Sequence, residues 1–427
     1  MEFIQENARK TPVRGTFDVI VAGSGPSGVC AALRAARSGA KTMLIEQNGC
    51  LGGMWTAGLL GWMIDHDKPE SSLLKDLKAE LRKRSPSAGP PPCSGSFAFE
   101  PECMKLLLEE LCEEAGIAIR LYTTVAGTIP REEGGIDCVI TESKSGREAW
   151  KGKIFIDATG DGDLGALSGC SFDFGSPEDG HLQPMSMLAV LTGIRLPEIL
   201  RYVNGYTPRT EAVNNLHDLL TENGAEPTYH DATLFYLSDE LFLLMANHEY
   251  RVSGCDADDL TRSAIAARRE IHSQIAALRR SGPEWKNLTV AATAERIGVR
   301  EGRRIRGLYQ ISLADLLEGR SQPDAICHVK AGIDIHALKP SFSNGFADHK
   351  YKSQPYDIPL RSLISADVPN LILTGRCISG DFYAHASYRV TGNMVPLGEA
   401  AGVLAALSVR ENLPPAQVSY ELVKEHL

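Results

Sequence analysis

The chain has 427 residues, 43% of them hydrophobic and 23% charged, which is typical of a folded globular protein with room for two domains. A formal net charge of −10 argues against a nucleic-acid partner, and no run approaches the ~18 apolar residues of a membrane-spanning helix. Ten cysteines occur without a CxxC pair, which argues against a zinc ribbon, an iron–sulfur cluster and a redox disulfide. Residues 1–16 have no signal-peptide core, so we expect a cytoplasmic protein with free thiols, no metal site and no membrane partner.

The first motif is a dinucleotide-binding unit. Its parts are a strand, a glycine turn, a helix and a second strand, at residues 17–22, 23–28, 29–38 and 42–45. Gly23 permits a tight turn, Gly25 leaves room for a pyrophosphate, and Gly28 lets the helix pack closely on the strand. Glu46 ends the second strand, where a carboxylate accepts hydrogen bonds from the adenosine ribose. This context favours nucleotide binding over a merely structural glycine turn.

A second glycine loop follows at residues 47–58. A domain that binds only a nicotinamide cofactor has no need of it, whereas in an FAD-binding protein the chain runs close along the flavin and side chains would collide there. A flexible loop is the alternative interpretation.

The next elements are predicted from apolar spacing and from turn residues. Leucines at helical spacing predict a helix over residues 63–84, and the proline-rich stretch 85–92 predicts a surface loop. A second helix is expected from Pro101 to about Ala115, ended by Gly116. Short alternating runs between residues 117 and 154 predict an antiparallel meander, with strands at 118–121, 137–140 and 149–151.

A strand at residues 153–158 precedes a second formal GxGxxG pattern, at residues 160–165. Asp161 and Asp163 would place two carboxylates against a pyrophosphate, which is repulsive. We therefore interpret the pattern as a strand end that lies beside the first glycine turn.

From about residue 174 to 347 the pattern changes, which predicts a second domain. Its clearest element is an amphipathic helix over residues 257–280. The acidic residues 256–259 lack the glycine and glutamate of a calcium loop, so we interpret them as a helix cap. A basic cluster follows, for which surface ion pairs with Glu295 and Glu301 are the favoured interpretation: Arg296, Arg300, Arg303, Arg304 and Arg306.

The last segment returns to the first domain. A buried strand at residues 370–375 leads through a turn to a polar stretch at 382–389 and a helix from about Val395 to Val409. Gly398 and Gly402, four residues apart, predict close packing of this helix. Its N-terminus can stabilise negative charge that develops on a reduced flavin.

Four stretches, at residues 18–58, 156–169, 298–315 and 370–407, resemble the FAD-dependent oxidoreductases of the glutathione-reductase-like superfold, in the FAD_oxidored subgroup. The resemblance implies an α/β fold of three layers, with a parallel sheet, an antiparallel meander and helices, and an inserted α+β substrate domain. It implies an FAD-binding domain at residues 1–173 and 348–427 and a cap domain at 174–347. It also implies one FAD per chain, bound by Gly23, Gly25, Pro26, Ser27, Gly28, Glu46, Gln47, Gly52, Gly53, Met54, Thr56, Ala57, Val125, Ala158, Thr159, Gly160, Asp161, Gly375, Arg376, Ser379, Gly380, Asn393 and Met394.

A looser similarity concerns the substrate. His385 and Arg389 keep the four-residue spacing of the HGxNR motif of succinate dehydrogenases and fumarate reductases, although Ala386 and Tyr388 depart from it. On a helix this spacing would put both side chains on one face. The alternatives are a buried histidine satisfied by the backbone and an arginine paired with a carboxylate. Tyr383 is a third polar group able to reach a substrate.

The leading functional hypothesis is a hydride transfer between FAD and a small organic substrate. His385 would donate or accept a proton, and Arg389 would hold an anionic or carbonyl group. The alternatives are a flavoprotein with a structural or RNA-modifying role and an NAD-dependent dehydrogenase. The sequence identifies no electron donor or acceptor.

Overall fold

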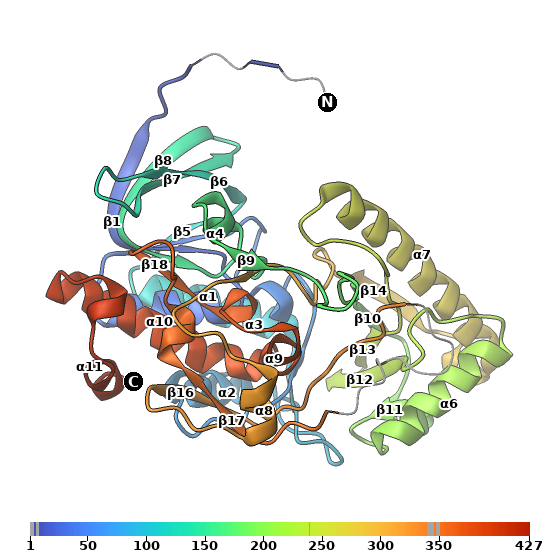
Figure 1. Cartoon of the computed structure of the whole chain (residues 1–427). Coiled ribbons are helices and arrows are strands. Elements are labelled where there is room, and N and C mark those ends of the chain that lie inside the picture. Colours follow the sequence, from blue (N-terminus) through green and yellow to red (C-terminus); the bar gives the residue numbers. More distant parts are fainter. Residues whose placement is uncertain (1–3, 6–7, 239, 340–345, 347–350) are drawn as a thin grey trace.

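The predicted dinucleotide unit lies at the centre of a seven-stranded sheet (Figure 1). The structure is a computed structural model that describes residues 4–5, 8–238, 240–339, 346 and 351–427. The strand order is β5-β2-β1-β8-β7-β6. β7 pairs with the first half of β8, and β18 pairs with residues 155–157 at the end of β8, along the same edge of that strand. The strands are β1 (Val13–Ala22), β2 (Thr42–Ile45), β5 (Ala118–Arg120), β6 (Thr123–Pro130), β7 (Ile136–Ser143), β8 (Gly146–Asp157) and β18 (Leu371–Leu373).

One prediction within this sheet is wrong. Residues 118–121 were assigned to the meander, but β5 pairs in parallel with β2 at the edge of the main sheet. Its direction is set by helix α3 (Pro101–Glu114), because a helix between two strands supplies the crossover that parallel pairing needs. The antiparallel meander is confirmed for the strands predicted at 137–140 and 149–151, which lie in β7 and β8, whereas its third strand, β6, was not predicted.

Helices α1 (Pro26–Arg37) and α10 (Thr391–Glu411) pack directly against each other over this sheet (Figure 1). A Cβ atom on Gly398 would lie 2.3 Å from the carbonyl oxygen of Ser27, and one on Gly402 would lie 2.3 Å from that of Ala31. The predicted close packing through these glycines is therefore confirmed. α10 begins four residues before the predicted Val395, with Pro396 inside the helix rather than at its start.

α10 is also the one described helix that is long and apolar enough to cross a membrane. Its mean hydropathy over the apolar window is 1.2, and 94% of that window is buried inside the protein, as in the core helix of a soluble fold.

The predicted helix at residues 63–84 is shorter than expected. Helix α2 spans Ser72–Arg84, because the side chain of Ser71 caps it by accepting a hydrogen bond from the Leu74 amide. Trp62 and Met63 instead form the short strand β3, which pairs with β4 (Phe97–Ala98). The remaining elements of this part are α4 (Asp163–Leu167), β9 (Phe172–Asp173), β15 (Arg304–Ile305), α8 (Leu313–Glu318), β16 (Ala325–Val329), β17 (Tyr356–Pro359), α9 (Phe382–Tyr388) and α11 (Tyr420–Glu425).

A second sheet of five strands, in the order β11-β12-β13-β10-β14, lies to the right of the first in Figure 1. Asp256 caps α7 by accepting a hydrogen bond from the Asp259 amide, which confirms the predicted role of the acidic run. The elements are β10 (Ala189–Thr192), α5 (Leu196–Ile199), β11 (Val203–Asn204), α6 (Arg209–Glu222), β12 (Thr233–Ser238), β13 (Leu241–Met245), α7 (Ala257–Ser281) and β14 (Thr289–Thr293).

Each sheet has its own cluster of buried apolar side chains. The second cluster runs from Met185 to Val299 and also takes up Leu59, Trp62 and Ala98. Residues from Ile305 onward pack in the first cluster again. Judged by these clusters, the chain returns from the second sheet to the first soon after residue 299. The sequence analysis instead ends the cap domain at residue 347, which lies outside the described residues. The two-domain division stays a prediction in its boundaries.

Candidate active site

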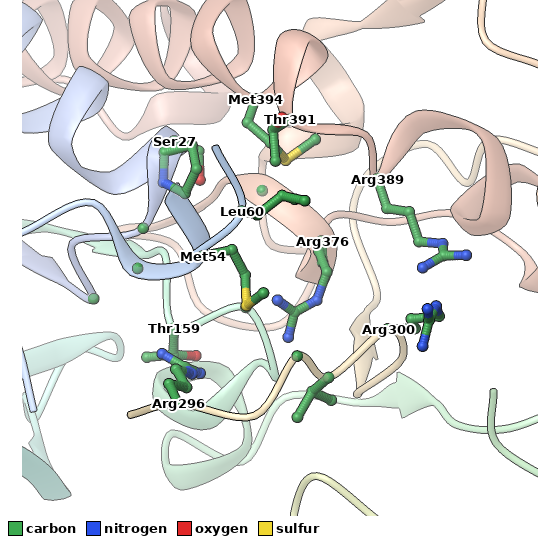
Figure 2. Close-up of a pocket in the computed structure, with 18 of the residues that line it drawn as sticks. Ser27, Met54, Leu60, Thr159, Arg296, Arg300, Arg376, Arg389, Thr391 and Met394 are labelled. Atoms are coloured by element: carbon green, nitrogen blue, oxygen red, sulfur yellow. The ribbon is translucent and has the colours of Figure 1, made fainter. Parts of the chain in front are cut away.

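A cavity of about 280 Å³ is lined by residues of both apolar clusters. Figure 2 shows that Ser27 and Thr159 lie at one end of it, and that Arg389 and Arg300 lie at the other. Met54, Leu60 and Arg376 lie between these ends (Figure 2). A glycine-turn end and an arginine end can therefore be distinguished, and we use these names below.

At the glycine-turn end, the three glycines of the first motif have different surroundings. Gly23 has a φ of +92°, and a Cβ atom there would lie 2.5 Å from the carbonyl oxygen of Ala158. A Cβ atom on Gly28 would lie 2.0 Å from the carbonyl oxygen of Gly23. A Cβ atom on Gly25 would meet no atom within 4 Å, so its missing side chain leaves open space. Gly23 and Gly28 are thus needed for packing, and Gly25 for access.

The open space lies at the N-terminus of α1. Gly25 is the N-cap residue and no side chain caps this end, so amide N–H groups of the first turn can bind an anion. The end of β8 lies beside this turn, because the Ala158 amide donates to the Ala22 carbonyl at 2.8 Å. This confirms the interpretation of the second GxGxxG as a strand end. The combination fits the pyrophosphate of a dinucleotide such as FAD.

Glu46 lies buried at the same end and lines the cavity. Its Oε2 accepts hydrogen bonds from the amide and the hydroxyl of Ser24, at 2.8 and 2.7 Å. Its Oε1 accepts from the amide and the side-chain Nδ2 of Asn48, at 2.8 and 2.6 Å. The two hydrogen bonds from backbone N–H groups fix the carboxylate. The side-chain donors of Ser24 and Asn48 can rotate away and leave lone pairs for the ribose hydroxyl groups.

Replacing Glu46 with glutamine should weaken FAD retention. The variant loses charge-assisted acceptance from ribose hydroxyls and brings a donor amide against Ser24 or Asn48, which should cost about 1–3 kcal/mol of binding free energy. The flavin dissociation constant, measured by fluorescence after reconstitution, tests this. Asp137→Asn, an exposed carboxylate on β7 paired with Lys151, is the control. An equal dissociation constant in both variants would contradict the ribose role of Glu46.

Most of the other predicted cofactor residues line the cavity. Those that do are Pro26, Ser27, Gln47, Gly53, Met54, Val125, Ala158, Thr159, Gly160, Gly375, Arg376 and Met394. The structure places another group behind the wall: Gly28, Gly52, Thr56, Ala57, Asp161, Ser379, Gly380 and Asn393. Two members of this group pack closely on each other, because a Cβ atom on Gly52 would lie 2.6 Å from Cγ2 of Thr56.

Asp161 illustrates this supporting position. Its Oδ1 accepts a hydrogen bond from Nη2 of Arg376 at 2.7 Å, and its Oδ2 lies 3.7 Å from Arg296. Both arginines line the cavity, whereas Asp161 does not. The carboxylate therefore orients two cations at the wall instead of facing a cofactor phosphate.

Of the predicted catalytic pair His385 and Arg389, only Arg389 lines the cavity. His385 lies on α9, while Arg389 is the C-cap residue of that helix and lines the cavity. The His385 side chain is fully buried with its ring edge against Tyr388, and neither ring nitrogen has a hydrogen-bond partner among the described residues. Burial and the charges of Arg304 and Arg389 hold the pKa of His385 well below its usual value. Tyr383, on the same helix, does not line the cavity either.

The interpretation of the basic cluster as surface ion pairs is wrong for three of its members, one of which is Arg296 at the cavity wall. Arg304 is buried and pairs with Glu301 at 2.6 Å, and Arg300 lines the cavity. Arg303 pairs with Asp163, and only Arg306 forms a largely exposed pair, with Asp173. The spacing of these arginines in the sequence does not show which of them face solvent and which face the interior, because both kinds occur in the same short stretch.

The arginine end also contains Asp334 and His336, which the sequence did not single out. Asp334 and His336 line the cavity, with Oδ2 of Asp334 at 3.5 Å from Nε2 of His336. Arg389 donates through Nη2 to the Asp334 carbonyl at 2.7 Å and to Oε1 of Gln183 at 3.0 Å. These residues belong to no motif, and the order DxH at 334–336 is too common to serve as a signal.

Electrostatics at this end favour an ionised Asp334. Burial raises its pKa, but the contact with His336 and the charges of Arg389 and Arg300 outweigh burial and hold that pKa below its usual value. Burial, with the charge of Arg300, lowers the pKa of His336 to about 4. Burial, with repulsion from Arg389, lowers the pKa of Arg300 to about 10, so that both guanidinium groups stay charged at pH 7.

Comparison with one known structure supports the fold. A geranylgeranyl bacteriochlorophyll reductase-like protein from Thermoplasma acidophilum superposes with a TM-score of 0.51 at 13% identity, covering 96% of this chain and 82% of that one. A p-nitrophenol 4-monooxygenase from Pseudomonas putida is similar with a TM-score of 0.47 at 12% identity, covering 96% and 84%. At these identities the likeness concerns the fold alone.

Sequence comparison adds a local match and a family. A thiamine thiazole synthase from Aeropyrum pernix is 37% identical over 70 residues, which are 16% of this chain and about a quarter (26%) of the relative. The model of the family described as FAD dependent oxidoreductase matches residues 18–427. The cofactor is therefore FAD, and not the NAD of the dehydrogenase alternative. The chain belongs to the FAD dependent oxidoreductase family.

Proposed function

We propose that this chain transfers a hydride between FAD and a small organic anion, with a carboxylate held by Arg300 and Arg389. One observation carries the proposal. Arg300 faces the cavity and donates through Nη1 to the Pro184 carbonyl and the Ser186 hydroxyl, both at 2.8 Å and both uncharged. Among the described residues, no carboxylate lies within salt-bridge distance of this arginine, and Asp334 acts on its charge without pairing with it.

The charge balance at the arginine end supports a single negative charge on the substrate. Arg300 and Arg389 contribute two positive charges, and Asp334, 3.4 Å from Arg389, contributes one negative charge. The remaining positive charge attracts a carboxylate, which gains strong hydrogen bonds when it accepts from a guanidinium fork.

In this proposal FAD and the side chains of the cavity have different roles. FAD, when bound, supplies the hydride donor or acceptor. The chain's own residues hold the substrate carboxylate at the arginine end and exclude water with the apolar wall formed by Leu60, Leu188 and Phe235. His336 faces the same end as a neutral imidazole, which suits it to exchange a proton with the substrate.

The test uses the FAD-loaded protein and a panel of small carboxylates that carry a keto, hydroxy or unsaturated group. Binding is followed by the change in flavin absorbance, and turnover by anaerobic reduction or reoxidation of the flavin. Arg300→Met should raise the dissociation constant of a bound carboxylate roughly 10- to 100-fold, the equivalent of losing 1.5–3 kcal/mol from a charged hydrogen bond. Arg306→Met removes an exposed arginine of the same cluster and should change nothing.

Two results would overturn the proposal. One is a carboxylate that binds to Arg300→Met as tightly as to the parent protein. The other is a substrate that reduces the flavin and carries no anionic group.

A further inference from the structure

We propose that Tyr250, His248 and His336 form a proton relay that carries protons between solvent and the arginine end of the cavity. The three side chains are in contact one after another. The Tyr250 hydroxyl lies 3.1 Å from Nδ1 of His248, and Nε2 of His248 lies 3.1 Å from Nδ1 of His336. The remaining nitrogen of His336, Nε2, lies at the cavity beside Asp334.

A relay needs accessible groups at its two ends and buried groups between them, and the exposure of these side chains follows that order. At the outer end the Tyr250 hydroxyl donates to the Thr228 carbonyl at 3.0 Å, in a hydrogen bond exposed to solvent. The two histidines are buried, with 1% and 5% of their surfaces exposed. At the inner end, Asp334 lines the cavity and 39% of its side chain is exposed. The histidines thus connect two accessible ends through a part of the protein that water does not reach.

The hydrogen atoms on this path fit in two arrangements. In the inward one, Tyr250 donates to His248, His248 donates to His336, and Nε2 of His336 carries a hydrogen toward the cavity. In the outward one, Tyr250 donates to the Thr228 carbonyl, both histidines donate toward the surface, and Nε2 of His336 presents a lone pair. Each neutral ring has one N–H group and one acceptor, so both arrangements satisfy the contacts of His248 with Tyr250 and with His336.

Passage from one arrangement to the other moves one proton. When Nε2 of His336 gives its proton to a substrate atom, the proton on Nε2 of His248 passes to Nδ1 of His336. The hydroxyl proton of Tyr250 then passes to Nδ1 of His248, and a surface water returns a proton to the Tyr250 oxygen. One bond to hydrogen forms for each that breaks, no electrons are transferred, and reversal of the steps removes a proton from a substrate.

The surroundings keep both rings in the neutral form that this exchange uses. Burial and the nearby charge of Arg300 lower the pKa of His248 and of His336. The Tyr229 ring packs on His248 with ring centroids 4.0 Å apart and separates it from water. The backbone amide of His248 donates to the Thr228 hydroxyl at 2.8 Å, which fixes the ring beside Tyr250.

The test follows the hydrogen shared by His248 and His336 in FAD-loaded protein with ¹⁵N-labelled histidine rings. Its exchange with water is measured by saturation transfer. Tyr250→Phe removes the outer hydroxyl and keeps the ring, and full flavin content verifies that the variant folds. Exchange should slow by roughly 10²-fold, the low end of what a positioned proton donor contributes. The control, Tyr420→Phe, loses a hydroxyl that donates to the Ala325 carbonyl elsewhere and should exchange as the parent does.

Exchange at the parent rate in Tyr250→Phe would overturn the relay, because the buried proton would then leave by another route. The relay serves the proposed hydride transfer, but this measurement needs no substrate and so fails or succeeds independently of that function. With a carboxylate substrate, Tyr250→Phe should lower the rate of the proton-coupled step and leave the dissociation constant unchanged, whereas Arg300→Met should raise the dissociation constant. Equal losses of binding in both variants would also contradict the relay.

Discussion

Replacing Gly25 with valine should give a folded protein that contains no FAD. Gly25 has a φ of −59° and a ψ of 178°, which any residue adopts, and a Cβ atom there would meet no atom within 4 Å. The valine side chain would therefore extend without strain into the space at the N-terminus of α1, where we expect the pyrophosphate of the cofactor to bind. Flavin content after purification, together with the melting temperature of the cofactor-free protein, measures both halves of this expectation.

The neighbouring glycine provides the contrast. In Gly28→Val a Cβ atom would lie 2.0 Å from the Gly23 carbonyl oxygen, so this variant should lose the fold together with the flavin. A Gly25→Val protein that purifies with a full complement of FAD would show that the pyrophosphate binds elsewhere. A Gly25→Val protein that fails to fold would show that the open space has a structural purpose.

Replacing His336 with glutamine should slow substrate-driven flavin reduction or oxidation by about 10²–10⁴-fold, the usual contribution of a positioned general acid or base. The side chain is at the cavity, and glutamine keeps a hydrogen-bonding group of similar length while losing the ability to accept and release a proton at pH 7. FAD content and carboxylate binding should stay near the parent values. Stopped-flow measurement of the flavin absorbance, with the substrate found in the carboxylate panel, provides the rate.

His385→Gln is the informative partner of this variant. The sequence assigns the proton to His385, which the structure buries between arginines and away from the cavity lining. We expect His385→Gln to react at close to the parent rate. If His385→Gln is the slow variant and His336→Gln reacts normally, the assignment from the sequence is right and the one from geometry is wrong.

The fold could be predicted where local chemistry decides it. The glycine turn, the acidic cap at Asp256 and the glycines of α10 each specify a contact within a few residues or a single close approach, and all three are confirmed. β5 was misassigned because alternation is the same for an edge strand of a parallel sheet and for a meander. The start of α2 was missed because the cap at Ser71 is a weaker signal than the apolar spacing on either side of it.

The sequence predicts the glycine-turn end in detail, whereas at the arginine end it singles out Arg389 alone as a substrate-binding group. At the glycine-turn end the cofactor imposes glycines and an acidic residue at fixed spacing, which a single sequence displays. The arginine end is assembled from segments far apart in the chain, and His248 and His336, for example, are 88 residues apart. Residues assembled in this way have no fixed spacing that a sequence could display. The net charge at the arginine end also depends on which arginines face inward. Arg300 and Arg306 look alike in the sequence and differ only in the direction that the fold gives them.

The pairing of β18 with β8 bears on how the protein is synthesised. The Asn370 side chain, just before β18, donates to the carbonyl of Lys153 on β8, 217 residues earlier, and α10 then covers the face of α1. While the chain emerges from the ribosome, the sheet and the cofactor cradle stay incomplete until these late segments have appeared. Contacts so distant in sequence form slowly, and the uncovered apolar face of α1 is prone to aggregation in the meantime. We therefore expect the cofactor cradle to become complete only after β18 and α10 have been synthesised.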